Sequence, residues 1–398
     1  MAIQTPFTKM QLIPQEEKLE VAKRKSELFI GIPKETSYQE KRICLTPDAV
    51  GTLVSHGHRV LMESGCGNGS SFSDKEYSEA GAEITNDTKK VLGCPIILKV
   101  EPLTLNEIEQ VNPQTIILSA IQLKTQKKSY FEALTKKRIT ALAFEFIKDE
   151  GGSYPMVKSL SEIAGTASIL IASELMISQN AGKGLLFGNI TGVPPTKVVI
   201  LGAGTVAEYA ARTAVGLGAN VKVFDNSITK LRRLQNSLNQ RIFTSTIQEK
   251  SLLKSLRRCD VAIGAMRGKN RAPIVVTNTM VEQMKRGAVI VDVSIDTGGC
   301  FETSEVTTHE NPTFVKNDVI HYCVPNIPSR YSKTASTSIS NILTPFLLNI
   351  AEDGGLEPAI RYNKGLKNGV YFYHGLLTNK SIADWFNIDY RDINLIVF

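Results

Sequence analysis

The sequence predicts an α/β fold with two doubly wound parallel-sheet domains, the second inserted into the first, and an interdomain cleft. The first observation is that short apolar runs alternate with helical segments along most of the 398 residues. This alternation is typical of parallel strands that are covered by helices on both faces. The second is that the runs form two series with a long helical stretch between them, and that a helix-rich tail follows. We expect the tail to return and cover the first domain.

The first series predicts a flavodoxin-like substrate domain made of residues 28–155 and the tail, residues 334–398. Thr46 and Pro47 predict a helix start, because a capping side chain precedes proline at the first helical position. Lys127–Lys137 predicts another helix. Residues 1–27 are expected to form a charged, loosely packed extension. The predicted strands are Leu28–Ile32, Arg59–Met62, Pro95–Val100, Thr115–Ile121 and Ile139–Phe146.

The second series predicts a domain of residues 156–333, which opens with a long helix over Val157–Gln179. A further helix is expected over Thr334–Ile350, and no strand series is expected after it. Ligands of such sheets bind at the carboxyl ends of the strands, so the cleft is the expected site. The predicted strands are Val198–Leu201, Val221–Phe224, Arg241–Thr244, Val261–Ala265 and Ala288–Val293.

The turn after Val198–Leu201 carries the pattern G-x-G-x-x-A, formed by Gly202, Gly204 and Ala207. Gly202 allows a sharp turn, Gly204 lets backbone amides approach a pyrophosphate, and Ala207 lets the helix pack close to the strand. The helix dipole and the free amides at the helix start would hold the anion. The predicted contacts at this start are made by Thr205, Val206 and Ala207.

An acid ends the next predicted strand. Asp225 lies about twenty residues beyond the glycines, where a carboxylate can bind both ribose hydroxyls of NAD. The same charge should repel the extra phosphate of NADP. Strand, glycine turn, helix and acid together predict a Rossmann-type NAD-binding domain.

Composition excludes several other classes of protein. The net charge of +7 comes from scattered Lys and Arg, with no basic run among aromatics, so we expect no nucleic-acid partner. No apolar run reaches membrane-spanning length, and no signal peptide is evident. The six cysteines show no C-x-x-C pair or metal-ligand spacing, which favours reduced thiols in the cytoplasm and no metal.

Two segments of the first domain carry charge at predicted strand ends, GIPKETSYQEKRICLTP (Gly31–Pro47) and ILKVEP (Ile97–Pro102). The first resembles the alanine dehydrogenase and transhydrogenase family, and the resemblance extends almost continuously from about Leu28 to about Ile388. The other segments that carry it are GCGNGSSFSDKEYSEAGAEI (Gly65–Ile84), LSEIAG (Leu160–Gly165), LGAGTVA (Leu201–Ala207), DVSIDTGGCFETSEVTTHENPTF (Asp292–Phe314) and YCVPNIPSRYSKTAS (Tyr322–Ser336).

The resemblance favours the alanine dehydrogenase branch. Transhydrogenase NAD-binding subunits lack the pattern D-x-x-I-D-x-G-G-C-F-E, which this chain has from Asp292 onward. The resemblance implies NAD-dependent oxidation of L-alanine with water to pyruvate, ammonium and NADH. It also implies a homo-oligomer, either a hexamer built from dimers or a dimer. A transhydrogenase-type NAD(H)-binding subunit is the alternative within the family.

The resemblance also implies roles for individual residues. Arg42 matches the arginine that clamps the substrate carboxylate, for which a guanidinium is well shaped. Asp296 matches an acid beside the nicotinamide, which assists proton transfer and orients the attacking water or ammonia. Three residues match cofactor contacts: Ser161 at a phosphate, Lys230 near the adenosine ribose and Asn326 near the nicotinamide ribose.

The same residues have plain structural interpretations. Without the resemblance, Arg42 would be one surface arginine among many, and Asp296 would cap the glycine turn before Gly298 and Gly299. Ser161 would be a helix N-cap, and Asn326 a turn residue before a proline.

The chain departs from the family at two substrate positions. ILKVEP is one residue shorter than the family pattern K-V-K-E-P, and Lys99 is the only candidate there for the substrate-binding lysine. LSAIQLKT replaces a segment ending in F-L-H-L, which puts Gln122 at the acid/base histidine. Glutamine cannot take up a proton near neutral pH, and none of the five histidines is an obvious replacement.

Three functions therefore stay open. In the first, an alanine dehydrogenase uses Asp296 and bound water to carry the proton. In the second, the changed pocket serves a different amino acid or oxo acid. In the third, the protein is a pseudoenzyme that binds NAD without turnover.

Overall fold

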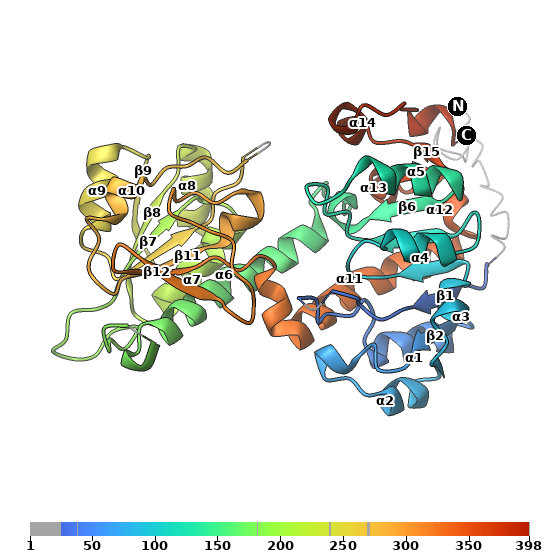
Figure 1. Ribbon diagram of the computed structural model, residues 1–398, viewed down its shortest axis with the longest axis horizontal. Coiled ribbons are helices and arrows are strands. Elements are labelled where there is room, and N and C mark those ends of the chain that lie inside the picture. The colour runs from blue at the N-terminus through green and yellow to red at the C-terminus, as the bar shows by residue number, and fades with distance from the viewer. Residues whose placement is uncertain (1–24, 38, 181, 239, 269–270, 398) are drawn as a thin grey trace, which may run out of the picture.

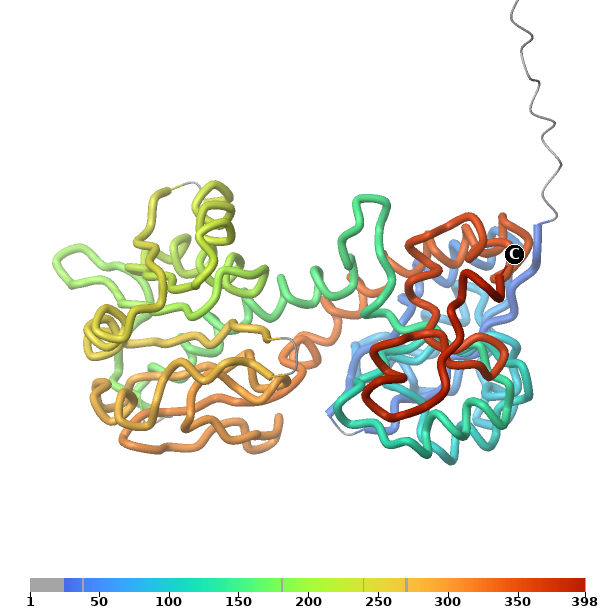
Figure 2. Tube along the Cα trace, turned by 90° about the horizontal axis from the view of Figure 1, so that it is seen from above, coloured from blue at the N-terminus to red at the C-terminus, as the bar shows by residue number. Residues whose placement is uncertain are grey.

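The computed structural model describes residues 25–37, 39–180, 182–238, 240–268 and 271–397. Most of the predicted N-terminal extension, residues 1–24, lies outside this part of the chain. The described residues form two sheets in two lobes, which are joined by the long helices α6 (Pro155–Leu175) and α11 (Ser332–Glu352) (Figures 1 and 2). No helix in the described ranges is long and apolar enough to cross a membrane.

The first sheet has eight described strands in the order β15-β14-β6-β5-β4-β1-β2-β3. Strands β1 to β6 run parallel, and β1 lies between β2 and β4, with Gly31 level with both Leu61 and Ile97. The bounds are β1 (Phe29–Ile32), β2 (Arg59–Glu63), β3 (Glu83–Thr85), β4 (Ile96–Leu98), β5 (Ile116–Ser119), β6 (Thr140–Ala143), β14 (Val370–Tyr373) and β15 (Leu376–Leu377).

Helices cover both faces of this sheet. α1 begins as predicted, with Pro47 in its first turn and the Thr46 hydroxyl accepting a hydrogen bond from the Ala49 amide at 3.4 Å. The bounds are α1 (Pro47–Ser55), α2 (Asp74–Glu79), α3 (Thr88–Leu92), α4 (Leu105–Gln110), α5 (Lys128–Lys136), α12 (Leu356–Tyr362), α13 (Lys364–Gly369) and α14 (Lys380–Phe386).

The second sheet has the order β12-β13-β11-β10-β7-β8-β9 among the described residues. After β7 the chain builds outward through β8 and β9, then returns to the other side of β7 with β10, so the switch point lies beside the end of β7. The elements are β7 (Lys197–Leu201), α7 (Thr205–Gly216), β8 (Asn220–Phe224), α8 (Ile228–Ser237), β9 (Phe243–Ser245), α9 (Glu249–Leu256), β10 (Val261–Gly264), α10 (Asn278–Val281), β11 (Val289–Asp292), β12 (Thr313–Lys316) and β13 (Val319–Tyr322).

Both sheets are buried on both faces, which confirms the predicted doubly wound class. In β4, Ile96 and Leu98 enter one apolar cluster and Ile97 enters another. In β10, Val261 and Ala262 likewise belong to different clusters. Successive side chains of a strand point to opposite faces, so each sheet has a core above and below it.

Three parts of the sequence prediction were wrong. The helix predicted to reach Gln179 ends at Leu175, and β12, β14 and β15 run antiparallel to their neighbours. The tail also contains strands, although we expected none there. β14 is a run of only four residues, all buried, and its place beside β6 depends on a pairing that no local pattern reveals.

Candidate active site

The two glycines of the loop have different roles: the backbone requires Gly202, whereas Gly204 leaves space for a ligand. Gly202 has a φ of 108°, and a Cβ there would lie 2.4 Å from the carbonyl oxygen of Ala265. Gly204 caps α7 with a φ of −83°, and a Cβ there would meet no atom within 4 Å. No side chain in the described structure caps this helix start. The loop thus leaves open space and free amides where a pyrophosphate would bind.

Asp225 is tied directly to this loop. Its carboxylate accepts hydrogen bonds from the amides of Ala203 at 2.8 Å and Ser227 at 2.7 Å. Lys230 lies one turn into α8, and its amide donates to the Ser227 hydroxyl at 3.3 Å. The acid and the glycine loop therefore stand together, as an NAD-binding domain requires.

Helix α6 passes close to the start of α7. A Cβ on Gly165 would lie 2.4 Å from the carbonyl oxygen of Val206, so only glycine permits this approach. Ser161 is one turn earlier in α6, and its hydroxyl donates to the carbonyl of Val157 at 2.6 Å. Because α6 begins at Pro155, Ser161 is not an N-cap. Its predicted contact with a cofactor phosphate stays a prediction.

A buried ion pair lies where the first domain meets the second. Nε of Arg42 donates to Oε1 of Glu40 at 2.7 Å, and Nη2 donates to Oε2 at 2.5 Å. Burial opposes the charge on Arg42, but Glu40 raises its pKa above the ordinary value. Arg42 is thus no ordinary surface arginine, since only 6% of it is exposed.

Asn326 connects this pair to the second domain. Its side-chain amide donates to Oε2 of Glu40 at 3.0 Å, and its backbone amide donates to Oδ1 of Asp296 at 3.3 Å. Asn326 has a φ of 57°, a left-handed conformation that asparagine tolerates better than most residues. The residues predicted to hold the substrate and the nicotinamide end are therefore brought together through Glu40.

Asp296 does not cap the glycine turn before Gly298 and Gly299, so its plain structural interpretation was wrong. Asp292, at the end of β11, accepts hydrogen bonds from the amides of Ser294 at 3.0 Å and Cys300 at 2.9 Å. Asp292 therefore fixes the loop that contains η5 (Val293–Thr297), and the Asp296 carboxylate is left facing the junction. Burial raises the pKa of Asp296, although Arg42 partly opposes this.

The end of β4 adds acids to the first-domain side. The carboxylate of Glu35 accepts hydrogen bonds from the amides of Val100 at 2.6 Å and Glu101 at 3.3 Å. Burial raises the pKa of Glu35 to about 8, so its carboxyl is mostly neutral at pH 7. Burial also raises the pKa of Glu101, and the nearby Gln122 side chain partly opposes this.

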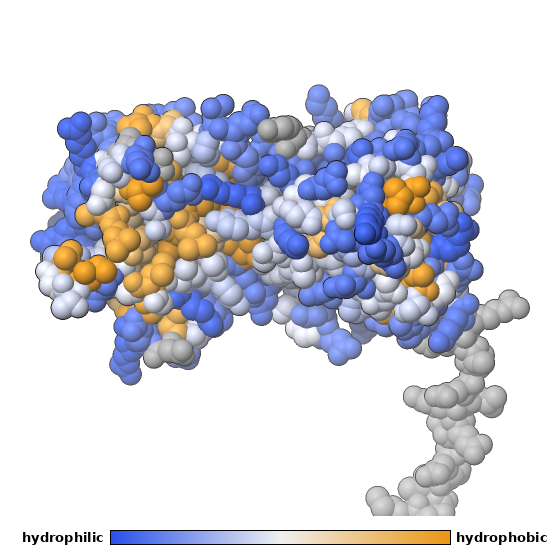
Figure 3. Space-filling view, turned by 90° about the horizontal axis from the view of Figure 1, so that it is seen from below, coloured by the Kyte–Doolittle hydropathy of each residue, from blue (hydrophilic) through white to orange (hydrophobic). Residues whose placement is uncertain are grey.

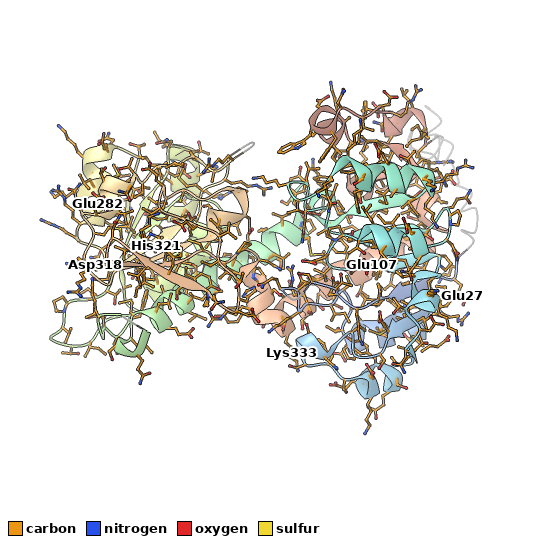
Figure 4. The ribbon with its side chains drawn as sticks, viewed as in Figure 1. Glu27, Glu107, Glu282, Asp318, His321 and Lys333 are labelled. Atoms are coloured by element: carbon orange, nitrogen blue, oxygen red, sulfur yellow. The ribbon has the colours of Figure 1, made fainter. Side chains whose placement is uncertain are left out.

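The ammonium group of Lys99 is hydrogen-bonded to first-domain side chains. Nζ donates to Oε1 and Oε2 of Glu107 at 2.9 and 3.0 Å, and to the Thr36 hydroxyl at 3.3 Å. Figure 4 shows Glu107 among the elements of the first domain. A role for Lys99 in substrate binding stays a prediction, and the geometry gives it a structural partner instead.

Gln122 follows β5 in a left-handed conformation, with a φ of 46°. The Glu145 carboxylate holds this turn, because it accepts hydrogen bonds from the amides of Ile121 at 3.0 Å and Gln122 at 3.3 Å. His321 lies in the second domain (Figure 4), where its ring pairs with Thr303 at 2.8 Å. It therefore does not replace the expected histidine.

Sequence reasoning missed five acids of this region. Four of them lie at a strand end or within three residues of one, where charge was the available signal, whereas Glu40 lies eight residues beyond the end of β1. Charge alone could not show which of these acids belong to the site, because their hydrogen-bond partners come from distant segments of the chain. The five are Glu35, Glu40, Glu101, Glu145 and Asp292.

Fold and site together define an oxidoreductase of the NAD-dependent dehydrogenase class, with a glycine loop in one domain and a buried arginine in the other. The alanine dehydrogenase/PNT N-terminal domain model matches residues 31–164, and the C-terminal domain model matches residues 168–380. The chain therefore belongs to the alanine dehydrogenase/PNT family.

Individual relatives agree with this assignment. An alanine dehydrogenase of Staphylococcus epidermidis is 36% identical over 366 residues, which are 92% of this chain and 98% of the relative. A solved L-alanine dehydrogenase has a TM-score of 0.85 at 33% identity, covering 90% of this chain and 99% of its own. A transhydrogenase from Sinorhizobium meliloti agrees in fold, with a TM-score of 0.75 at 24% identity over 89% of this chain and 99% of its own.

Proposed function

We propose that this protein catalyses the NAD-dependent oxidative deamination of L-alanine to pyruvate and ammonium. The proposal depends mainly on one arrangement, in which Asn326 links Asp296 of the second domain to the Glu40–Arg42 pair of the first. The glycine loop lies close to Asp296. Gly202 packs against Ala265 and Met266, which follow β10. The Met266 amide donates to the hydroxyl of Ser294, two residues before Asp296, at 2.8 Å. The 36% identity to an alanine dehydrogenase supports the choice of substrate.

Arg42 would hold the substrate carboxylate. Nε and Nη2 donate to Glu40, and no hydrogen bond from Nη1 is present among the described residues. That edge of the guanidinium would then bind the carboxylate and direct the substrate Cα toward the second domain. When bound, NAD would accept the hydride from Cα. Asp296 would orient the attacking water and assist proton transfer.

NAD is the proposed cofactor, held at the pyrophosphate by the amides of Thr205, Val206 and Ala207 and at the ribose by Asp225. Replacing Asp225 with asparagine keeps an oxygen for the Ala203 amide and removes the charge. We expect Asp225→Asn to weaken NAD binding about 10-fold or more and to improve NADP relative to NAD, since one charged hydrogen bond contributes about 1.5–3 kcal/mol. Asp260→Asn, an equally buried aspartate at the other end of the sheet, is the matched control.

The direct test is NAD reduction by L-alanine at alkaline pH, where release of a proton favours oxidation. Wild type and Asp296→Asn are compared by NADH absorbance, with NADH binding measured in parallel. Turnover that Asp296→Asn abolishes supports the proposal. If L-alanine fails and another small amino acid or oxo acid succeeds, the substrate assignment is wrong but the dehydrogenase class stands.

A second candidate function follows from Gln122, which cannot carry a proton. In that case the protein binds NAD(H) without turnover, as a pseudoenzyme or a transhydrogenase-type subunit. Retained NADH binding with no turnover in wild type, and activity gained in Gln122→His, would favour it. Histidine suits this test because it tolerates the left-handed backbone of residue 122.

We also propose that the protein is cytoplasmic, because its six cysteines are free thiols.

We further propose that it forms a homo-oligomer. Apolar surface gathers on one face of the second domain (Figure 3). Exposed apolar side chains on α6 and the segment after it include Leu170, Leu186, Ile190 and Val193. Leu186→Asp should dissociate the assembly in light scattering. Leu395→Asp, at an equally exposed position of the first domain (72% for both leucines), should not.

A further inference from the structure

A pocket of about 690 Å³ lies beside the junction of the two domains. Its walls come from the end of α6, the segment that leads into β12, the end of β13 and η6 (Ile327–Tyr331), with Lys41 from the first domain. The described residues that line it include none of those assigned above to NAD or to the substrate. The pocket is therefore separate from the proposed active site.

Two of the lining residues carry buried polar atoms without a hydrogen-bond partner. Within the described part of the chain, three buried side-chain atoms lack one: the Tyr322 hydroxyl, Nε2 of His309 and Nζ of Lys183. Lys183 forms an ion pair with Asp260 at 3.8 Å, whereas the other two residues both line the pocket. A buried polar group without a partner destabilises a protein. A ligand in the pocket would supply the partners that these two groups lack.

The Tyr322 hydroxyl has a fixed place in the wall of the pocket. Only 1% of the residue is exposed, and its backbone is paired in β13 with Thr313 of β12. Rotation of a tyrosine ring about its own axis does not move the hydroxyl, so this group cannot turn to bulk solvent. Burial lowers the pKa of His309, so its ring is neutral at pH 7 and can donate through Nε2 as one of its tautomers. Both groups can therefore donate to a ligand without carrying charge themselves.

Two cationic residues of the same pocket have donors that are not in use. Nη2 of Arg330 donates to Glu174 at 2.6 Å, and its other nitrogens donate to none of the described residues. Lys41 donates to the Ser329 hydroxyl through its backbone amide at 3.0 Å, while its ammonium group forms no ion pair within the described structure. Glu310, the other acid of the lining, is exposed. The pocket thus offers charged and neutral donors beyond those that its own acids occupy.

We propose that this pocket is a second ligand site, which binds a small metabolite through a carboxylate or phosphate group. The anionic oxygens would accept hydrogen bonds from the Tyr322 hydroxyl and the His309 ring, and from the free donors of Arg330 and Lys41. Guanidinium and ammonium groups are common partners of carboxylates and phosphates in proteins. Ligand pockets typically have volumes of about 300–1,000 Å³, so an organic part fits beside the anionic group.

The wall of the pocket continues into the substrate side of the junction. The His309 amide donates to Oε1 of Gln39 at 3.0 Å, and the Ser329 hydroxyl donates to the Gln39 carbonyl at 2.8 Å. Gln39 directly precedes Glu40, whose carboxylate accepts from Asn326. A ligand would therefore bind next to the contact between the domains. The proposal concerns binding alone, so it stands whether or not the protein oxidises L-alanine.

The test is isothermal titration calorimetry of the full-length protein with sodium malonate and with potassium phosphate, at constant ionic strength and in the presence of NADH. At least one of the two anions should bind saturably, and the tighter one indicates which group the pocket prefers. Tyr322→Phe should weaken this binding about 10-fold, because it removes one hydrogen bond to a charged group. Lys41→Met should weaken it about threefold, as expected for an exposed charge.

Tyr130→Phe is the matched control, because the Tyr130 hydroxyl is similarly buried but pairs with that of Tyr371 at 3.1 Å in the first domain. It should leave anion binding unchanged and lower the thermal unfolding temperature, whereas Tyr322→Phe should not lower that temperature. Equal anion binding by wild type, Tyr322→Phe and Lys41→Met would place the anion elsewhere and overturn the proposal. Absence of saturable binding by both anions at millimolar concentrations would overturn it as well.

Discussion

Asn326 of the second domain donates a hydrogen bond from its side chain to Oε2 of Glu40 in the first domain, at 3.0 Å. The same oxygen accepts from Nη2 of Arg42, so one carboxylate is shared between the predicted substrate clamp and the predicted cofactor contact. This contact joins side chains that lie far apart in the sequence, and it is one of several between the domains at the site, where the Ser329 hydroxyl also donates to the Gln39 carbonyl at 2.8 Å.

Asn326→Ala should lower kcat/KM for L-alanine about 10- to 100-fold, because a hydrogen bond to a charged group contributes about 1.5–3 kcal/mol. Steady-state kinetics at saturating NAD measure it. The control is Asn278→Ala, which removes an asparagine–glutamate bond of 2.6 Å on the surface of the second domain. Equal kinetics for the two variants would contradict the prediction.

Substitutions of the two loop glycines should have different effects, one on cofactor binding and the other on stability. Gly204→Ala meets no atom and has an ordinary φ, so its stability should equal or exceed wild type by about 0.4–1 kcal/mol, while NADH affinity falls at least about 10-fold. Gly202→Ala should instead destabilise the fold by several kcal/mol, roughly the sum of left-handed strain and a backbone clash. Thermal unfolding and NADH fluorescence measure both. Wild-type NADH affinity in Gly204→Ala would mean that the cofactor binds elsewhere.

Glu35 should make stability depend on pH. Its pKa rises from 4.5 when unfolded to about 8 in the native state. Between these values the native state keeps a proton that the unfolded chain has released. Stability is therefore lost as pH rises from 4.5 to 8, by up to about 5 kcal/mol.

Glu35→Gln mimics the neutral carboxyl, so its unfolding free energy should fall less over this pH range than that of wild type. Urea unfolding at several pH values measures the difference. Glu79→Gln, at an exposed position, is the control and should follow wild type. Parallel curves for wild type and Glu35→Gln would show that Glu35 is ionised in the native state.

Lys99→Met should cost about 3–5 kcal/mol of stability, because Glu107 would stay buried without its partner. Lys99→Met combined with Glu107→Gln should recover much of this loss, since glutamine still completes the helix cap with Thr104. Lys75→Met, in an exposed pair, should cost about 0.5 kcal/mol or less. If the double variant is stable but its KM for L-alanine rises about 10-fold or more, Lys99 binds substrate after all.

The sequence predicted the elements whose signals are local. The glycine pattern, the Thr46–Pro47 helix start and the apolar runs of β1, β7 and β10 all depend on neighbouring residues, and each was found close to its predicted bounds. The tail strand β14 was missed because four buried residues have no periodicity of their own, and only pairing with β6 makes them a strand.

The residue types at the site were also present in the sequence by itself: an arginine, an acid in a glycine turn, and a glutamine at the position of the family's histidine. Only the tertiary structure decided their partners. It paired Arg42 with Glu40 and Lys99 with Glu107. These pairings determine which charges are buried and which acids can take a proton, and they form only when separate strands bring their carboxyl ends to one edge.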